Sequence, residues 1–291
     1  MRSPQNPPRF VKGDLPVRQL LALVGAVIGF ACTAHADTPA LTLSFGGEER
    51  SFTAKELLAR PDAATIEIPN DPSYGKAMSY RAVPLLALLG ENREINLDTI
   101  EARALDGFVS QIPLALVVGG SSAGGSVAWV AVEDPASSWP PLPGKAVSAG
   151  PFYLVWEQPE RSGVGSEQWP YQLASLAGVE SPAHRWPQMV VAQDLPANAP
   201  ARHGQAVFTA QCMPCHRMKG AGESDLGPDL GQPMSPTQYF TAEALRQLIR
   251  DPKSVRTWPQ QAMPGFDQEK LSDADLDAVI AYLGAMAAPA R

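Results

Sequence analysis

Cysteine is scarce in this chain of 291 residues, which contains only Cys32, Cys212 and Cys215. Three cysteines cannot build the disulfide framework that stabilises many small secreted domains. A structural zinc site requires four cysteine or histidine ligands. The chain has four histidines in total and no second pair of closely spaced cysteines. Both a disulfide scaffold and a zinc module are therefore disfavoured.

Basic charge is also in short supply. The chain has 23 Lys and Arg residues against 30 Asp and Glu residues, a net charge of −7. The deficit lies in residues 37–200, whereas residues 201–291 are nearly balanced. An acidic chain is a poor binder of nucleic acid, so we expect no nucleic-acid partner. The acidic half is interpreted first as a solvated surface, and alternatively as a surface that steers a basic protein partner.

No hydrophobic run is long enough to span a bilayer. The longest, Leu20–Ala34, is shorter than the roughly 20 residues that a spanning helix needs. It follows four basic residues and ends at the small-x-small sequence Ala34-His35-Ala36. This pattern predicts a secretory signal peptide over residues 1–36, a periplasmic location and no membrane span in the mature chain. An uncleaved anchor and lipidation of Cys32 are the alternatives.

One short stretch carries the clearest chemistry, Cys212-Met213-Pro214-Cys215-His216. Two cysteines three positions apart with a histidine directly after the second form the attachment pattern of haem c. Each thiol can add to one vinyl group of the haem, and His216 can then ligate the iron as the proximal ligand. A redox-active disulfide and half of a zinc site are the competing interpretations.

Residues 37–180 have the alternating pattern of an α+β domain. Strands are expected at 41–45, 65–68, 78–82, 99–104, 108–112, 127–132 and 152–156, and short helices at 53–58 and 83–89. Asp106-Gly107 lies between two of these strands and predicts a hairpin turn. The glycine-rich stretch 119–125 lacks the lysine of a phosphate-binding loop and is expected to be a surface loop.

This region resembles the molybdopterin-binding domain of sulfite-oxidase-type oxidoreductases. The resemblance rests on Tyr80-Arg-Ala-Val-Pro-Leu85, Asp106-Gly107-Phe108, Gly150-Pro151-Phe152-Tyr-Leu-Val155 and Glu167-Gln-Trp-Pro-Tyr171. Active members of that family bind molybdenum through a cysteine thiolate, and residues 37–180 contain no cysteine. Ser110, Ser148 and Asp106 are oxygen donors in the matching half of the domain, but no pattern marks them as ligands. We therefore expect neither molybdopterin nor molybdenum.

Residues 181–200 are rich in proline and predict a linker, with a final strand and an arm packed on one of the domains as the alternative. Residues 201–291 resemble class I cytochrome c along their whole length, which implies an all-α domain. The resemblance implies a first helix at 201–211 whose Gly204 and Phe208 meet Tyr282 of the last helix. It also implies that the carbonyl of Pro228 accepts a hydrogen bond from His216.

The second axial ligand is expected to be Met263. It lies in Met263-Pro-Gly-Phe266, between two predicted helices, which is the context of the distal methionine in class I cytochromes c. Met234 is the second choice. Met218 is too close to His216 in the sequence to reach the opposite face of the haem, and Met286 lies on or beyond the last helix.

Together these features predict a multidomain chain that transfers single electrons through one haem c, to or from a periplasmic redox protein or dehydrogenase. No catalytic residue is assigned. A molybdopterin-dependent oxidoreductase with a fused cytochrome is the alternative. It conflicts with the missing cysteine and with the absence of a twin-arginine pair before the hydrophobic run. A haem-based sensor with an open sixth position is a third hypothesis.

Overall fold

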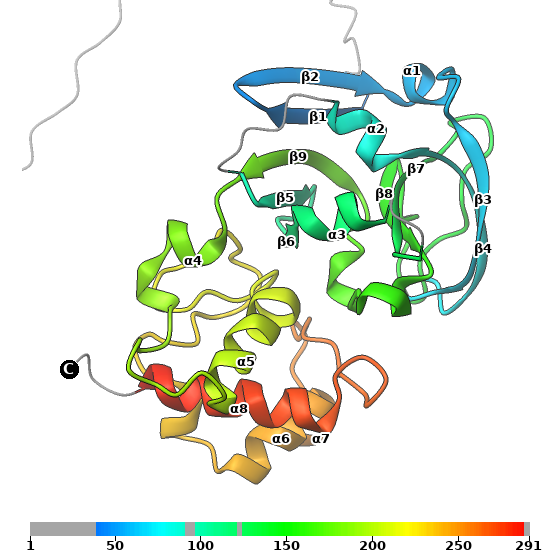
Figure 1. Cartoon of the computed structure of the whole chain (residues 1–291). Helices are drawn as coiled ribbons and strands as arrows, with labels where there is room; N and C mark the ends of the chain where they lie inside the picture. Colours follow the sequence, from blue (N-terminus) through cyan, green and yellow to red (C-terminus); the bar gives the residue numbers. More distant parts are fainter. Residues whose placement is uncertain (1–38, 91–96, 121–123, 288–291) are drawn as a thin grey trace, which may run out of the picture. The chain divides into compact units, whose positions relative to one another are not determined.

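The structure is a computed structural model that describes residues 39–90, 97–120 and 124–287. The predicted signal peptide therefore lies outside the described residues. The described part of the chain contains two hydrophobic cores. One is built from residues between Leu41 and Leu176, and the other from residues between Met189 and Met286. An α+β region surrounds the first core and a helical region surrounds the second (Figure 1).

The first sheet of the α+β region has five strands in the order β2-β1-β9-β5-β6. Its strands are β1 (Ala40–Phe45), β2 (Glu48–Thr53), β5 (Thr99–Ala104), β6 (Val109–Pro113) and β9 (Leu173–Val179). Strand β9 lies between β1 and β5, parallel to the former and antiparallel to the latter. The predicted hairpin is present as β5 and β6, with Asp106-Gly107 in the turn.

The second sheet has four antiparallel strands in the order β3-β4-β7-β8. They are β3 (Ala64–Asp71), β4 (Lys76–Pro84), β7 (Val127–Val132) and β8 (Phe152–Glu157). Strand β8 is buried along almost its whole length because both of its faces are covered. Three short helices belong to this region, α1 (Ala54–Leu58), α2 (Leu85–Leu89) and α3 (Leu114–Gly119).

Helix α1 begins where the sequence predicts it. The Thr53 hydroxyl accepts the backbone N–H of Glu56 at 3.3 Å, and the Glu56 carboxylate accepts the Thr53 N–H at 2.8 Å. This reciprocal capping box satisfies two N–H groups that the first helical turn leaves unpaired. Helix α3 was not expected, since its sequence Leu-Ala-Leu-Val-Val-Gly continues an apolar strand without a capping residue.

The helical region contains α5 (Pro200–Val207), the π-helical turn η4 (Phe208–Cys212), α6 (Ala242–Arg250), α7 (Pro252–Val255) and α8 (Asp273–Ala287). Ser272 precedes α8 and caps it, because its hydroxyl accepts the N–H of Asp275 at 3.1 Å. Helices α5 and α8 pack against each other (Figure 1). The predicted partners meet, because the rings of Phe208 and Tyr282 have centroids 5.1 Å apart.

Gly204 explains how closely α5 and α8 approach. A Cβ atom at this position would lie 1.9 Å from the carbonyl oxygen of Ala278 and 2.8 Å from Cβ of Tyr282. Real Cβ atoms do not come this close to other atoms, so only glycine fits between the two helices. The contact places the residues that follow α5, which include both cysteines, at a fixed distance from α8.

The proline-rich stretch 181–200 is an arm packed on the helical region. It contains α4 (Pro182–Arg185) and a short 3-10 turn, η3 (Pro187–Met189). Met189 and Val191 belong to the core of the helical region, and the Tyr282 hydroxyl donates to the Met189 carbonyl at 2.7 Å. This stretch therefore packs on the helical region, and it contains α4 and η3 rather than a final strand.

Candidate haem site

A tight turn presents the two thiols. Helix α5 gives way to the π-helical turn η4, where the N–H of Met213 donates to the Phe208 carbonyl at 2.8 Å. The N–H groups of Cys215 and His216 both donate to the Cys212 carbonyl, at 3.1 and 2.9 Å. These bonds fold the five-residue motif back on itself, so the thiols and the imidazole belong to one compact turn.

Both cysteines are half-buried free thiols. Burial, and after it the negative charge of Glu167, raises the pKa of each thiol to about 12. The thiols are therefore protonated at neutral pH. Addition of a thiol across a vinyl group consumes the whole S–H unit, and both thiols are free for it. Disulfide exchange proceeds through the thiolate, so the raised pKa values disfavour a redox-active pair.

The His216 side chain is oriented by its neighbours. Its Nδ1–H donates to the carbonyl oxygen of Pro228, with 2.8 Å between the two atoms. Burial lowers the pKa of His216, and this hydrogen bond only partly opposes the effect. The imidazole is therefore neutral, and its Nε2 lone pair remains available for a metal. A histidine ligand held through its other nitrogen by a carbonyl is a common arrangement at metal sites.

Gly227 makes room for this imidazole. A Cβ atom there would lie 2.5 Å from Cε1 of His216 and 2.6 Å from Nδ1. The N–H of Gly227 also donates to the Cys215 carbonyl at 2.7 Å, which ties the loop before Pro228 to the motif. The loop Leu226-Gly-Pro-Asp-Leu230 thus packs against one side of the His216 imidazole.

The four candidate methionines differ in their surroundings. Met218 and Met286 are buried in the core, with 0% and 5% of their surfaces exposed, whereas Met234 is 47% exposed. Met263 is partly buried and packs against the edge of the core of the helical region. Met263 thus combines partial burial with the loop position expected of a distal ligand, and its role as the ligand stays a prediction.

The α+β region contacts the cysteine motif directly, which the sequence did not reveal. The N–H of Val109 on β6 donates to the carbonyl of Pro214, between the two cysteines, at 3.3 Å. The Ser224 hydroxyl donates to the Gly107 carbonyl at 3.2 Å. The 3-10 turn η2 (Ser166–Gln168) packs against η4. The α+β region contributes only backbone groups to the two hydrogen bonds, so no side-chain pattern in that region marks them.

Four charged side chains join the same two regions and the arm between them. The Arg185 guanidinium lies 2.7 Å from a Glu101 carboxylate oxygen and 3.1 Å from a Glu223 oxygen. Arg103 lies 3.0 Å from Glu101 and 3.7 Å from Glu223. Burial tends to raise the pKa of Glu101, but hydrogen bonds from Arg185 and Gln111 outweigh it and lower that pKa. Glu101 is therefore ionised and paired.

The α+β region has a buried polar centre at Asp71, which is 1% exposed. One carboxylate oxygen accepts the N–H groups of Ser73 and Tyr74 at 2.9 Å each and the Tyr153 hydroxyl at 3.2 Å. The other accepts the Tyr80 hydroxyl at 2.8 Å. Burial and the charge of Asp71 raise the pKa of both phenols, so they remain donors.

The three oxygen donors considered as replacements for a cysteine ligand lie in different settings. The Ser110 hydroxyl is fully buried without a hydrogen-bond partner. Ser148 accepts the N–H of Gly150 at 3.1 Å, and Asp106 is exposed and accepts the N–H of Phe108 at 3.1 Å. Among residues 39–90, 97–120 and 124–287, no three His, Cys, Asp or Glu side chains gather as a group that could hold a metal ion.

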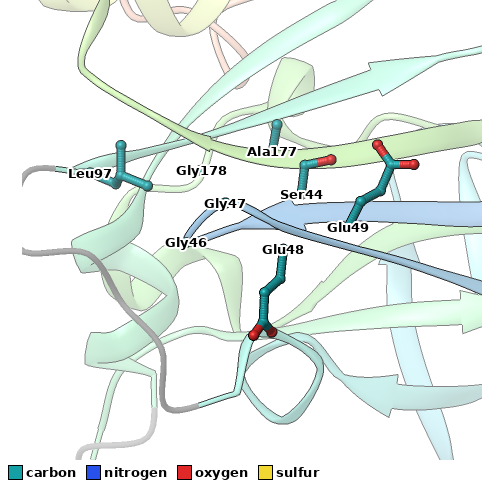
Figure 2. Close-up of a pocket in the computed structure, with 8 residues that line it drawn as sticks. All are labelled: Ser44, Gly46, Gly47, Glu48, Glu49, Leu97, Ala177 and Gly178. Atoms are coloured by element: carbon teal, nitrogen blue, oxygen red, sulfur yellow. The ribbon is translucent and has the colours of Figure 1, made fainter.

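An open pocket in the α+β region lies beside the turn between β1 and β2. Figure 2 shows that Ser44, Gly46, Gly47, Glu48, Glu49, Leu97, Ala177 and Gly178 line it. The lining contains no sequence-predicted site residue and no histidine or cysteine. It therefore adds nothing to the haem site.

Comparison with known proteins agrees with the motif. A family model described as cytochrome c matches residues 201–287. Among solved structures, the chain is similar to the sulfane dehydrogenase SoxCD from Paracoccus pantotrophus, with 17% identity and a TM-score of 0.33. That match covers 49% of this chain and 38% of the other. No curated protein sequence matches the chain.

Residues 201–287 thus form a cytochrome c domain, preceded by an α+β region. Cytochrome c domains carry covalently bound haem, and the residues present fit that group. The site has two free thiols and a neutral imidazole whose Nε2 is oriented by the bond at Nδ1. Gly227 leaves space for that imidazole ring. In the portion of the chain that the structure describes, no helix is sufficiently long and apolar to span a bilayer.

Proposed function

We propose that this chain is a periplasmic c-type cytochrome that passes single electrons to or from a redox partner. The hydrogen bond between His216 Nδ1 and the Pro228 carbonyl, next to two free thiols, is the observation that carries the proposal. When bound, haem c supplies one-electron chemistry at its iron. Cys212 and Cys215 would hold the ring, and His216 and Met263 would ligate its iron.

The protein residues determine what kind of chemistry is possible. An iron ligated by both His216 and Met263 would favour outer-sphere electron transfer over the activation of oxygen. The Pro228 carbonyl fixes the tautomer of His216 and increases its basicity as a ligand. The α+β region contacts the cysteine turn through Val109 and contacts Ser224 of the following loop through Gly107, so we assign it the role of a support and docking surface for the haem domain.

Covalent attachment is tested by extraction with acidified acetone. Thioether bonds survive denaturation, whereas axial bonds do not, so the colour should remain with the polypeptide. Cys212→Ala or Cys215→Ala should lower the yield of holoprotein and leave one thioether. The double variant should lose all colour to the solvent. Complete extraction of haem from the unaltered protein would contradict the proposal.

We further propose that residues 37–180 hold no molybdenum. That stretch contains no thiol, and the buried carboxylate of Asp71 already accepts four hydrogen bonds from the protein. Elemental analysis of protein made in a molybdenum-replete host is the test. We expect about one iron per chain and negligible molybdenum. Stoichiometric molybdenum with a pterin would instead support the alternative, a molybdopterin oxidoreductase wired to its own cytochrome.

A further inference from the structure

Two carboxylates of the α+β region lie beside the cysteine turn. Asp106 is in the β5–β6 turn, where the neighbouring Gly107 accepts the Ser224 hydroxyl and Val109 donates to the Pro214 carbonyl. Glu167 is in η2, which packs against both η4 and β6. Two separate segments of the α+β region therefore each bring one negative charge to the turn that holds Cys212 and Cys215.

The approach of η2 to η4 is close and specific. A Cβ atom at Gly165 would lie 1.7 Å from the side-chain nitrogen of Gln211, so the backbone of η2 rests directly on the residue before Cys212. The N–H of Gly165 donates to the Gln168 side-chain oxygen at 2.9 Å, which closes the turn around Glu167. Glu167 is half-buried in this position, and Ser166 donates to its carboxylate at 3.2 Å.

The electric field of these carboxylates reaches the sulfur atoms. After burial, the charge of Glu167 is the next cause that raises the pKa of both thiols, and Asp106 acts on Cys215 as well. Thioether bonds would join these sulfurs to the haem ring itself. A charge that acts on both sulfurs therefore also acts on a ring attached through them, because Coulomb interactions are only weakly screened in a partly buried site.

We propose that Glu167, assisted by Asp106, lowers the reduction potential of the haem and couples electron transfer to proton transfer. This inference rests on the proposed function, because it requires a haem on Cys212 and Cys215. A nearby carboxylate stabilises the oxidised state, which carries one more positive charge than the reduced state. Glu167 is a residue that tunes the potential and takes no part in binding the haem.

The proton balance follows from the same charge. When one electron leaves for the redox partner, the added positive charge favours the ionised form of Glu167, and its carboxyl releases a proton to water. When an electron returns, the carboxyl takes a proton up. Burial raises the pKa of Glu167 above its usual value and only partial compensation comes from Ser166 and Lys270. The potential should therefore fall with increasing pH as Glu167 ionises.

The groups around Glu167 are few. Lys270 is the cation that acts on it, Cys212 and Cys215 face it from the haem turn, and Asp106 lies near Cys215. Strand β6, which also packs against η2, presents Ser110 and Gln111, which do not titrate in this range. Both thiols become thioethers in the holoprotein and cease to titrate, which leaves Glu167 as the carboxyl that acts on both sulfur positions.

The test is a spectroelectrochemical titration of full-length holoprotein from about pH 4 to pH 8, a range that includes the ordinary carboxyl pKa. Glu167→Gln should raise the midpoint potential at neutral pH and flatten its pH dependence, and Glu167→Asp should preserve both features. Asp106→Asn should raise the potential by a smaller amount. Glu160→Gln, the same change at an exposed position of the 3-10 turn η1 (Pro159–Ser162), serves as the matched control and should change neither feature.

The outcomes separate this inference from the proposed function. An unchanged potential and pH profile in Glu167→Gln, with haem still covalently bound, overturns the inference and leaves the proposed function intact. Absence of covalent haem in the unaltered protein overturns both. Should Glu167→Gln fail to accumulate, Asp106→Asn together with Glu167→Asp still decides the matter. An unchanged potential in Asp106→Asn would contradict the claim that carboxylate charge sets the potential. A flattened pH profile in Glu167→Asp, which keeps the carboxyl group, would contradict it as well.

Discussion

The two regions of this molecule organise their polar chemistry in opposite ways. In the cytochrome c domain, five consecutive residues bring together two thiols and an imidazole, and one loop adds the carbonyl of Pro228. In the α+β region, the polar centre joins Asp71 to Tyr80 on the adjacent strand and to Tyr153 on β8. The first arrangement can be read along the chain, whereas the second exists only after the sheet has formed.

The largest expected effect tests the assignment in the cytochrome domain. Met263→Ala should open the sixth position of the iron, so that carbon monoxide binds the reduced protein readily. The potential should fall by on the order of tenths of a volt, because the axial ligand is a principal determinant of haem potential. Carbon monoxide titration and redox potentiometry measure the two effects.

Met234→Ala is the matched control for this experiment. Met234, like Met263, follows the cysteine motif in the sequence, but 47% of its surface is exposed. It should leave the spectrum and potential unchanged. If Met234→Ala opens the site and Met263→Ala does not, the distal ligand is Met234. If the unaltered protein already binds carbon monoxide readily, the third hypothesis, an open sixth position, applies.

The next effect tests the α+β region. Asp71→Ala should leave the hydroxyls of Tyr80 and Tyr153 and two backbone N–H groups without their acceptor, which costs about 3 kcal/mol of unfolding free energy. Chemical denaturation followed by tryptophan fluorescence measures the loss. The haem absorbance should be unchanged in native buffer, since Asp71 belongs to the other core.

Asp62→Ala provides the comparison for Asp71. The Asp62 carboxylate pairs with Arg60 at 2.7 Å on the surface, and such pairs contribute under about 1 kcal/mol. A loss of similar size in both variants would show that the hydrogen bonds to Asp71 contribute little. Loss of haem in Asp71→Ala would show that the two cores are not independent in stability.

The sequence predicted the parts of the fold that depend on local patterns. Strands β3, β4, β7 and β8 and the capped helix α1 lie where these patterns place them. Strand β2 was missed because its sequence Glu-Glu-Arg-Ser-Phe-Thr is almost entirely polar. Strand β9 was missed because small residues dominate Leu-Ala-Ser-Leu-Ala-Gly-Val, and only pairing with the distant strands β1 and β5 defines it.

The candidate site was likewise predictable only in part. Cys212, Cys215 and His216 are contiguous, so chemistry alone identifies them. The support from Val109 and Gly107 uses backbone atoms, and Glu167 resembles any surface acid until η2 is placed against η4. Asp71 also carried no signal, since its partners come from elements that the sequence cannot bring together.

A smaller effect tests the contact between α5 and α8 in the cytochrome domain. Gly204→Ala should force the helices apart, because the new Cβ would meet the Ala278 carbonyl at 1.9 Å, and should cost about 2 kcal/mol. Gly284→Ala on the exposed side of α8 has no atom within 4 Å of its new Cβ and should stabilise the helix by about 0.5–1 kcal/mol. Thermal unfolding monitored by haem absorbance compares them. If both substitutions change the stability in the same direction, Gly204 is not needed for the close approach of the α5 and α8 backbones.

The smallest effect concerns the charged group that joins the two regions. Glu101 has a pKa below its usual 4.5, because hydrogen bonds from Arg185 and Gln111 outweigh the cost of burial. A carboxyl with a lowered folded-state pKa stabilises the fold fully above its unfolded pKa and loses that contribution as pH falls through the folded pKa. Glu101→Gln should therefore cost about 1 kcal/mol at pH 7. The unfolding free energies of variant and unaltered protein should converge as the pH falls below 4.5. Denaturation curves at pH 7 and in the acid range measure the difference in unfolding free energy between the two proteins. A difference that stays constant with pH would show that the interaction between Arg185 and Glu101 does not depend on the charge of Glu101.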